Sequence, residues 1–427
     1  MSDSRSREMN AARGDHAHDD ADAVGCWVTR VPELEHTFSG RLRIDPVDAA
    51  AVLARADLGD QYIVYEWAGT WHVAAGAAAE LSVTADALRL RAGQWHDSLP
   101  VTDPVEATGD AVSRLQRSCP ERWCYGWAAF ELAYCIYGMH GASDGLCGGR
   151  AEVGNDPIIH VMVPAVDVVL RDGRVSIAST TDALLSRVRR ALDSNQEVPL
   201  VGPSISIPDM DSRPYSIAVQ KSIDAINDHQ LNKVVLSRVV PLPERSRLDF
   251  AQTYVVGRRA NTPARSFLMH LGGWSAVGFS PETVLEVDKN RRVRTLPLAG
   301  TRALVDDPET ARRIRGDLLS DVKEIHEHAI SAKLAMDEVR RVCDPDTVSV
   351  NRFMDIEERG SVQHLASRVT GVLRDEESPW TALSALFPAI TTTGVPKSAA
   401  LDLIHSLEDT ARGLYGGAVL ALAPDGA

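Results

Sequence analysis

The stretch Ser266-Phe-Leu-Met-His-Leu-Gly-Gly-Trp-Ser-Ala-Val-Gly-Phe279 predicts a β-hairpin, and that hairpin sets the fold class. Two apolar runs flank Gly272-Gly273, and glycine readily takes the positive φ that a tight primed turn requires. The following runs, at residues 283–287 and 292–297, repeat the arrangement around Asp288-Lys-Asn290. Strands joined by such short turns are antiparallel, so this part of the chain is expected to form an antiparallel meander.

A helical segment follows the meander and begins at Asp307, which is a candidate N-cap ahead of Pro308 at the first helical position. Its apolar residues recur every three or four positions, at Ile314, Leu318, Val322, Ile325 and Ala329. Gly316 interrupts this pattern, so the segment is one long helix or two. Further helices are predicted at residues 214–229, 380–386 and 398–406, a strand at 233–240, and another strand at 417–423.

The first half of the chain is rich in short strands separated by polar turns, at residues 62–67, 70–74 and 87–91. Helices are expected at residues 110–117, at 128–137 and once within 181–212, before a proline-rich linker. The aromatic-rich segment at 123–130 is interpreted as core. Together with the meander, these elements predict an α+β fold in which two antiparallel β-sheets pack together and helices lie outside.

Composition divides the chain and excludes several classes of protein. Residues 1–25 are polar and charged and are expected to be a disordered tail, followed by a β-rich part at 26–212 and a second part at 213–427. The net charge of −14 argues against a nucleic-acid partner, which requires a basic surface. No apolar run is long enough for a membrane span and no signal peptide is evident, so we expect a cytoplasmic protein. We also expect a monomer.

Two glutamates lie where a metal ion could bind. Lys323-Glu-Ile-His-Glu-His328 places Glu324 and Glu327 three residues apart on a predicted helix, so both side chains project from one face. Spacing alone favours a solvated charged surface near Lys323 and Lys333. The alternative is a hard divalent cation, and Mg²⁺ fits best because it prefers oxygen ligands and retains waters.

Two further residues have the chemistry of a base and an acid. Lys233 begins a hydrophobic run, where a lysine usually extends its ammonium to water. Burial would instead favour the neutral amine, which can act as a base. Glu282 follows Pro281, which cannot sit in a central strand, so the carboxyl lies where a strand leaves its ladder. That position permits a general acid.

Several small or polar residues could contact a ligand. Gly300 and Thr301 are predicted to lie in a loop between a strand and a helix, where glycine allows close approach and threonine supplies a hydroxyl. His364 lies in a strand-like run and is most simply a hydrogen-bonded core residue. Thr391 belongs to a turn-rich loop with three threonines, and Tyr415 has glycines on both sides. Each of these positions also has an ordinary structural explanation.

The order of these residues resembles that of one known family, the chorismate-binding enzymes, which include anthranilate, aminodeoxychorismate, isochorismate and salicylate synthases. The resemblance runs from about residue 215 to 427, half of the chain. It rests on eight motifs in order, namely Lys233-Val-Val-Leu-Ser-Arg238, Gly278-Phe-Ser-Pro-Glu282, Pro297-Leu-Ala-Gly-Thr-Arg302, Lys323-Glu-Ile-His-Glu-His328, Gly360-Ser-Val-Gln-His-Leu365, Phe387-Pro-Ala-Ile-Thr391, Gly394-Val-Pro-Lys397 and Gly413-Leu-Tyr-Gly-Gly417.

Lys233 indicates which members of the family the chain resembles. Family members that add ammonia have glutamine at this position, and those that add water have lysine. The strings at residues 261–267, 359–365 and 65–72 look most like salicylate synthases. This resemblance implies a salicylate synthase that converts chorismate through isochorismate to salicylate and pyruvate for siderophore biosynthesis. One alternative is an isochorismate synthase, which stops after the addition of water.

The resemblance also implies roles for the candidate residues. Lys233 would be the general base that activates water, and Glu282 the general acid that protonates the departing hydroxyl. Glu324 and Glu327 would hold Mg²⁺ against the ring carboxylate of the substrate. The remaining residues that would contact chorismate or isochorismate are Gly300, Thr301, His364, Thr391 and Tyr415.

The chain departs from the family at its C-terminal end. Family members continue past residue 423 into a strand with an arginine, a glycine-rich loop, and a helix with a second glutamate pair and a lysine. Those residues are not in this sequence, so the catalytic part at 213–427 is expected to be truncated and to hold Mg²⁺ weakly. A further alternative is therefore a fragment or a non-catalytic remnant that still binds chorismate.

Overall fold

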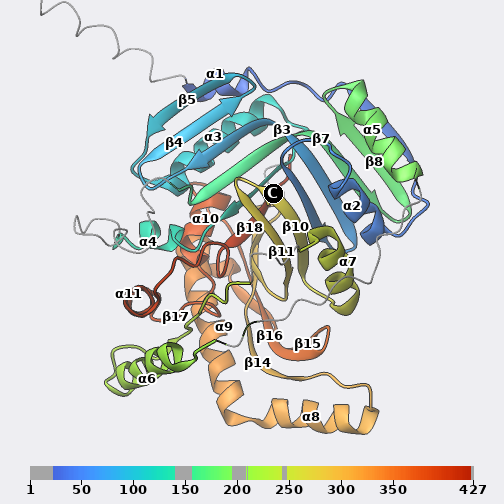
Figure 1. Ribbon diagram of the computed structural model, residues 1–427. Helices are drawn as coiled ribbons and strands as arrows, with labels where there is room; N and C mark the ends of the chain where they lie inside the picture. The colour runs from blue at the N-terminus through green and yellow to red at the C-terminus, as the bar shows by residue number, and fades with distance from the viewer. Residues whose placement is uncertain (1–22, 140–155, 195–207, 209, 243–247, 425–427) are drawn as a thin grey trace, which may run out of the picture.

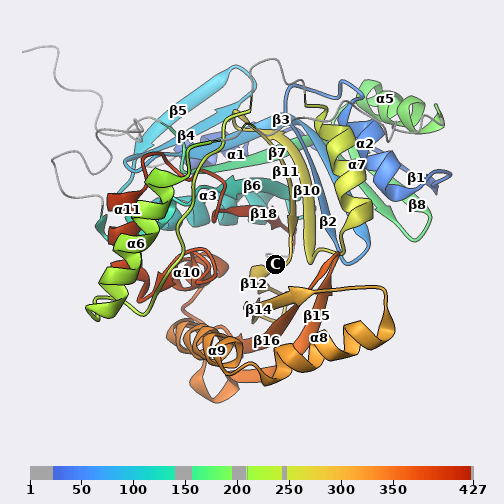
Figure 2. The same ribbon diagram turned by 60° about the horizontal axis from the view of Figure 1, so that its bottom comes forward.

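The computed structural model describes residues 23–139, 156–194, 208, 210–242 and 248–424. Two antiparallel β-sheets lie one above the other, with helices around them (Figures 1 and 2). This arrangement confirms the predicted α+β class. Residues 1–22 of the predicted tail lie outside the described residues, and α1 begins at Ala23.

The larger sheet combines strands from both halves of the chain. Its main path runs β1-β8-β7-β3-β2-β10-β11, with β6 and β18 attached through β7, and β4 and β5 through β3. Its strands are β1 (His36–Arg41), β2 (Tyr62–Trp67), β3 (Thr70–Val83), β4 (Ala87–Ala92), β5 (Trp95–Pro100), β6 (Cys124–Ala128), β7 (Ile159–Arg171), β8 (Arg174–Ser179), β10 (Arg265–Leu271), β11 (Trp274–Ser280) and β18 (Ala418–Leu422). The N-terminal part therefore shares one sheet with the part that carries the candidate site.

The predicted hairpin is confirmed in β10 and β11. Leu271 pairs with Trp274, and Gly272 and Gly273 form the turn with φ of 58° and 84°. Positive φ at both central residues is the geometry of a type I′ turn, whose twist matches that of the flanking strands. The hairpin places β10 against β2 and so joins the two halves of the chain.

The smaller sheet carries most of the candidate site. It follows the order β12-β13-β16-β14, and β15 also pairs with β16. Its strands are β12 (Thr283–Val287), β13 (Arg292–Leu296), β14 (Leu298–Ala303), β15 (Ser349–Arg359) and β16 (Val362–Val372). The predicted strands at 283–287 and 292–297 correspond to β12 and β13.

The loop predicted around Gly300 and Thr301 is wrong, because both residues lie within β14. The register of β14 against β16 shifts between Ala299 and Thr301, and Gly300 has a φ of 78°. Gly300 is thus the extra residue of a β-bulge, a position that favours positive φ and therefore glycine. A glycine beside a threonine resembles a loop in sequence, whereas here pairing with β16 holds it in the sheet.

Helices lie around the sheets, and the one at residues 379–386 also contributes side chains to the cores of both sheets. The helices are α1 (Ala23–Val28), α2 (Pro46–Ala54), α3 (Pro104–Ser118), α4 (Leu132–Ile136), α5 (Asp182–Asp193), α6 (Arg213–Asn227), α7 (Phe250–Ala260), α8 (Pro308–Ser320), α9 (Val322–Val342), α10 (Pro379–Leu386) and α11 (Lys397–Leu407). None of the helices in the described part of the chain is long and apolar enough to cross a membrane. The aromatic segment at 123–130 is core as predicted, since Tyr125, Trp127 and Phe130 are fully buried.

The predicted long helix is two helices, and the break lies at Asp321 rather than at Gly316. The Asp321 carboxylate accepts hydrogen bonds from the backbone N–H groups of Lys323 and Glu324, at 3.0 and 3.3 Å, and so caps α9. A new N-cap ends one helix and starts the next more effectively than a glycine, which an exposed helix tolerates at about 1 kcal/mol. Similarly, the helix predicted at 128–137 is restricted to α4, because residues 124–128 pair as β6.

The strand predicted at residues 233–240 is much shorter than expected. Only β9 (Lys233–Val234) is formed, and it pairs with β17 (Gly394–Val395) in a separate two-stranded sheet. Beyond it, the backbone N–H of Ser237 donates to the Glu408 carboxylate at 2.6 Å instead of to a strand. The β-branched run therefore continues as an irregular segment, and Val239 is exposed.

Candidate active site

Glu282 lies immediately before β12 and is surrounded by donors and cations. The Thr391 hydroxyl donates to its carboxylate at 2.5 Å, and the backbone N–H of Leu298 also donates to it. Burial raises the pKa of Glu282 to about 7, although these two donors and the ammonium groups of Lys233 and Lys397 pull it down. A carboxyl group with a pKa near neutrality is suited to donate a proton.

Lys233 is held beside this carboxyl group by the small sheet of β9 and β17. Val395 pairs with Lys233, and the Asn232 N–H donates to the Val395 carbonyl at 2.7 Å. A Cβ atom on Gly394 would lie only 2.1 Å from the Lys233 carbonyl oxygen, so the strands can approach this closely only with glycine there. The positive charge of Lys233 lowers the pKa of Glu282, which places the two candidate catalytic groups in one electrostatic environment.

A second, buried lysine lies behind Glu282. The Lys397 ammonium forms an ion pair with Glu338 at 2.7 Å and donates to the Leu386 carbonyl at 2.8 Å. Burial lowers the pKa of Lys397, while the Glu338 and Glu282 carboxylates raise it. Because Glu338 lies on α9 and Lys397 begins α11, this ion pair ties the Thr391 loop to the helix of the candidate metal ligands.

The bulged strand β14 connects the acid to the glutamate pair. Leu298 donates to Glu282, and two residues later a Cβ atom on Gly300 would lie 3.2 Å from the Glu324 carboxylate. The next residue, Thr301, is exposed, and its hydroxyl lies 2.9 Å from Nδ1 of His364. Burial, followed by the positive charge of Arg359, lowers the pKa of His364. His364 is therefore favoured as a neutral imidazole.

Gly300→Ala is expected to lower the free energy of unfolding by about 2–3 kcal/mol, as a result of both positive φ and close contact with Glu324 and Leu365. Gly173→Ala is the matched control. Gly173 has a φ of 69° but no atom within 4 Å of the added Cβ, so a loss of only about 1–2 kcal/mol is expected. Urea unfolding measures both values. Equal losses would show that the Glu324 contact adds nothing.

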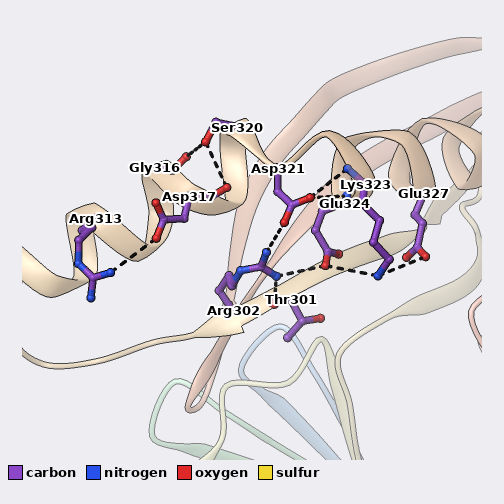
Figure 3. A network of polar contacts seen from close by, with 10 residues as sticks. All are labelled: Thr301, Arg302, Arg313, Gly316, Asp317, Ser320, Asp321, Lys323, Glu324 and Glu327. Carbon is purple, nitrogen blue, oxygen red and sulfur yellow. Dashed lines mark hydrogen bonds and ion pairs between the residues drawn. The ribbon is translucent and has the colours of Figure 1, made fainter.

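Glu324 and Glu327 project from one face of α9, as predicted. Figure 3 shows the Lys323 ammonium between them, 3.9 Å from Glu324 and 3.7 Å from Glu327. Arg302 forms ion pairs with Asp321 at 2.6 Å and with Glu324 at 3.2 Å. Cations thus compensate the carboxylates in this structure, and Lys333 pairs with Asp337 rather than with either glutamate.

The chemistry of this pair of carboxylates fits Mg²⁺. Mg²⁺ is usually held by one or two carboxylates, with waters and substrate oxygens completing an octahedral shell. Within the described residues, no group of three or more histidine, cysteine, aspartate or glutamate side chains is arranged to hold a metal. Glu324 and Glu327 would therefore supply two ligands and leave the remaining positions to water and substrate.

Tyr415 lies apart from the other candidates. It is 51% exposed and borders an open groove of about 470 Å³, together with Tyr215 and Arg238, which neither Lys233 nor Glu282 lines. Its link to the site is indirect, because the Arg412 guanidinium lies 5.7 Å from its ring and donates to the Thr392 carbonyl at 2.6 Å. The structure therefore brings together the other candidates and leaves Tyr415 at the margin.

Comparison with known proteins agrees with this geometry. A family model described as chorismate binding enzyme matches residues 60–427. The chain belongs to the chorismate-binding enzymes. The match includes most of the N-terminal part, so the family covers more of the chain than the motifs between residues 215 and 427 indicated.

Individual members of the chorismate-binding family are similar to this chain over different lengths. The salicylate synthase of Mycolicibacterium paratuberculosis is 36% identical over 391 residues, which are 90% of this chain and 84% of that protein. An anthranilate synthase component 1 of Halobacterium salinarum is 30% identical over 353 residues, which are 75% of this chain and 66% of that protein. The chain thus spans just under two thirds of that anthranilate synthase component.

A solved structure shows the same fold. The menaquinone-specific isochorismate synthase MenF from Escherichia coli superposes with a TM-score of 0.66 over 94% of this chain and 87% of that chain, at 17% identity. Anthranilate synthase component I from Streptococcus pneumoniae gives a TM-score of 0.60 over 84% of this chain and 81% of that chain, at 21% identity. These likenesses establish the chorismate-binding fold.

Four residues of the site were not identified from the sequence. They are Leu298, Arg302, Lys397 and Arg412, which act through a backbone N–H, two ion pairs and a set of carbonyl contacts. Three of them lie inside motifs that were recognised, and Arg412 immediately precedes another. The motifs therefore marked the right segments, whereas most partners of these four residues lie in other segments of the chain.

Proposed function

We propose that this chorismate-binding enzyme is a salicylate synthase, which converts chorismate through isochorismate to salicylate and pyruvate and so serves siderophore biosynthesis in the cytoplasm. The observation that carries the proposal is a lysine whose charge acts on a buried carboxyl group with a pKa near neutrality. Lys233 and Glu282 share one electrostatic environment, and burial raises the pKa of Glu282 to about 7. The similarity to the M. paratuberculosis salicylate synthase supports the choice within the family.

Lys233 and Glu282 divide the two proton transfers of the first step. Lys233, as the general base, takes a proton from water as the water oxygen bonds to ring carbon C2. The protonated carboxyl group of Glu282 gives its proton to the C4 hydroxyl, which leaves as water. The Thr391 hydroxyl and the Leu298 N–H orient the carboxyl group while it does so.

Glu324 and Glu327 would hold Mg²⁺ in this proposal. When bound, Mg²⁺ supplies positive charge that neutralises the ring carboxylate of chorismate and fixes its position. Because Gly300 has no side chain, Glu324 can lie against the backbone of β14. Thr301 and His364 form a hydrogen-bonded pair on adjacent strands. These residues would bind and orient the substrate ring.

The second step releases pyruvate from isochorismate in the same pocket. The hydrogen on ring carbon C2 passes to the methylene carbon of the enolpyruvyl group as the ether C–O bond breaks, so that pyruvate leaves and the ring becomes aromatic. This rearrangement needs mainly a constrained conformation of the substrate. Incubation of the 427-residue chain with chorismate and Mg²⁺, followed by separation of the products, tests the proposal. Salicylate and pyruvate in equal amounts are expected.

An isochorismate synthase is the second candidate, because Lys233 fits water addition in both enzymes. Isochorismate that persists without pyruvate would favour this candidate and reject salicylate synthesis. Binding of chorismate without any product would instead indicate a non-catalytic remnant. Anthranilate formed in the presence of ammonia would contradict the interpretation of Lys233.

Glu327→Gln is expected to raise the Mg²⁺ concentration needed for half-maximal activity by about tenfold or more, because an amide is a poorer ligand than a carboxylate. The measurement is product formation after removal of metal with a chelator and titration with MgCl₂. Glu309→Gln is the matched control, since Glu309 is an exposed glutamate on the neighbouring helix α8. An unchanged Mg²⁺ requirement in the Glu327 variant would remove this residue from the ligand set.

A further inference from the structure

The Arg412 guanidinium is buried at the junction of three segments that carry candidate site residues. Its side chain is 2% exposed and that of its partner Glu408 is 8% exposed. Nη1 donates to the Thr392 carbonyl at 2.6 Å, and Nη2 donates to the Val235 carbonyl at 2.7 Å. Thr392 follows Thr391, whose hydroxyl donates to Glu282, and Val235 lies two residues after Lys233. One side chain therefore contacts both the loop of Thr391 and the segment that begins with Lys233.

The carboxylate of Glu408 extends this junction. It accepts from Arg412 at 2.5 and 2.8 Å, and also from the backbone N–H and the hydroxyl of Ser237, at 2.6 and 2.9 Å. The carboxylate is therefore shared between the arginine and the irregular segment that follows β9. Each nitrogen of the guanidinium and each oxygen of the carboxylate has a hydrogen-bond partner, and a buried charge pair of this kind fixes geometry more strongly than a solvated pair.

A second carboxylate holds the turn on which Tyr415 lies. The Glu131 side chain accepts from the backbone N–H groups of Arg412 and Gly413, at 2.7 and 3.2 Å. The Arg412 guanidinium also lies over the Phe130 ring, 4.4 Å from its centroid. The segment from β6 to α4 thus anchors the backbone of Arg412, while the guanidinium reaches into the site.

We propose that Arg412 is a positioning residue that sets the distance between the strand of Lys233 and the loop of Thr391. This inference rests on the proposed function, since it assigns to Arg412 the alignment of the base with the acid. Only arginine can serve in this way, because its planar fork donates to two carbonyls and a carboxylate at once. A lysine offers a single point charge on a flexible stem.

Arg412 would affect the rate because proton transfer depends strongly on the distance between the reacting groups. Misplacement of a reacting group by about 1 Å can cost a factor of about 100 in rate. Loss of either carbonyl contact lets Val235 and Thr392 move apart, because the other contacts between these segments are few: the β9–β17 pair and the hydrogen bonds from Asn232 N–H to the Val395 carbonyl, at 2.7 Å, and from Val235 N–H to the Thr393 carbonyl, at 2.8 Å. Thr391 would then lose its alignment with the Glu282 carboxylate.

Arg412→Lys tests the proposal against a matched variant, Arg122→Lys. Arg122 is also buried and also donates to two carbonyls, those of Pro164 and Pro32, but it lies in the N-terminal part. Both variants are expected to lower the melting temperature. Only Arg412→Lys is expected to lower kcat, by about 10- to 100-fold, and to move the alkaline limb of the pH profile upward as Thr391 releases Glu282.

The outcomes separate this inference from the proposed function. Wild-type kcat and pH profile in Arg412→Lys, or an equal loss of kcat in Arg122→Lys, would overturn the inference and leave the proposed function intact. A wild-type chain that forms no product from chorismate overturns the proposed function instead. Hydrogen exchange then decides the positioning role, because Arg412→Lys must accelerate exchange at residues 233–235 and 391–395 and Arg122→Lys must not.

Should Arg412→Lys fail to fold, Glu408→Gln takes its place. This variant keeps the size of the side chain, but it removes the charge that holds the guanidinium and replaces one acceptor oxygen with a donor NH2 group. A loss of kcat of about threefold or more, with the same upward movement of the alkaline limb, is expected. Wild-type kinetics in this variant would contradict the inference.

Discussion

Lys233→Gln is expected to lower kcat for the addition of water to chorismate by about 100- to 10,000-fold, the range that a general base contributes. The amide cannot take a proton from water, yet its size lets β9 keep its pairing with β17. Binding of chorismate should change little, because Glu324, Thr301 and Thr391 remain in place. Product formation in the steady state and chorismate binding by calorimetry measure the two effects separately.

Lys221→Gln is the control for this variant. Lys221 is an exposed lysine on α6, so the substitution removes the same charge from the chain outside the site. Its kcat should stay within about twofold of the wild-type value, as is usual for exposed substitutions away from special features. If Lys233→Gln retains water addition, another group is the base and the assignment made from the lysine at this position is wrong.

The sequence predicted the fold well where the deciding contacts join residues that are close together in the chain. The Gly272-Gly273 turn and the spacing of Glu324 and Glu327 depend on neighbours in sequence, and both are found as expected. The break at Asp321 was also readable, because an aspartate precedes Val322-Lys-Glu324 as an N-cap. Gly316 does not end the helix, since one glycine in an exposed helix costs only about 1 kcal/mol.

Predictions failed where the deciding partner is distant in sequence. The length of β9 depends on Gly394 and Val395, about 160 residues away, which offer only two positions for pairing. Gly300 resembled a loop residue because the bulge that requires it arises from pairing with β16. For the same reason the motif around Lys397 marked a loop, while its buried ion pair with Glu338 on α9 could not be inferred.

Glu282→Gln is expected to lower kcat by about 100- to 10,000-fold, because the amide keeps the hydrogen bond from Thr391 but has no acidic proton for the departing hydroxyl. Glu121→Gln, an exposed glutamate in the N-terminal part, is the control and should retain wild-type kcat. A Glu282 variant with normal turnover would show that the C4 hydroxyl receives its proton from another group.

The pH dependence of the wild-type enzyme tests the same assignment without a substitution at Glu282. Because a general acid must be protonated and burial raises the pKa of Glu282 to about 7 in the free enzyme, kcat/KM should be lost as the pH rises through about 7, tenfold per unit. Thr391→Val removes a donor that favours the charged carboxylate, so the pKa of Glu282 should rise further and the alkaline limb should move to higher pH. Thr381→Val is the control, since Thr381 lies on α10 and its hydroxyl bonds only within the Ser378 cap. A limb that stays in place in Thr391→Val, or that moves equally in both variants, would mean that a group other than Glu282 sets it.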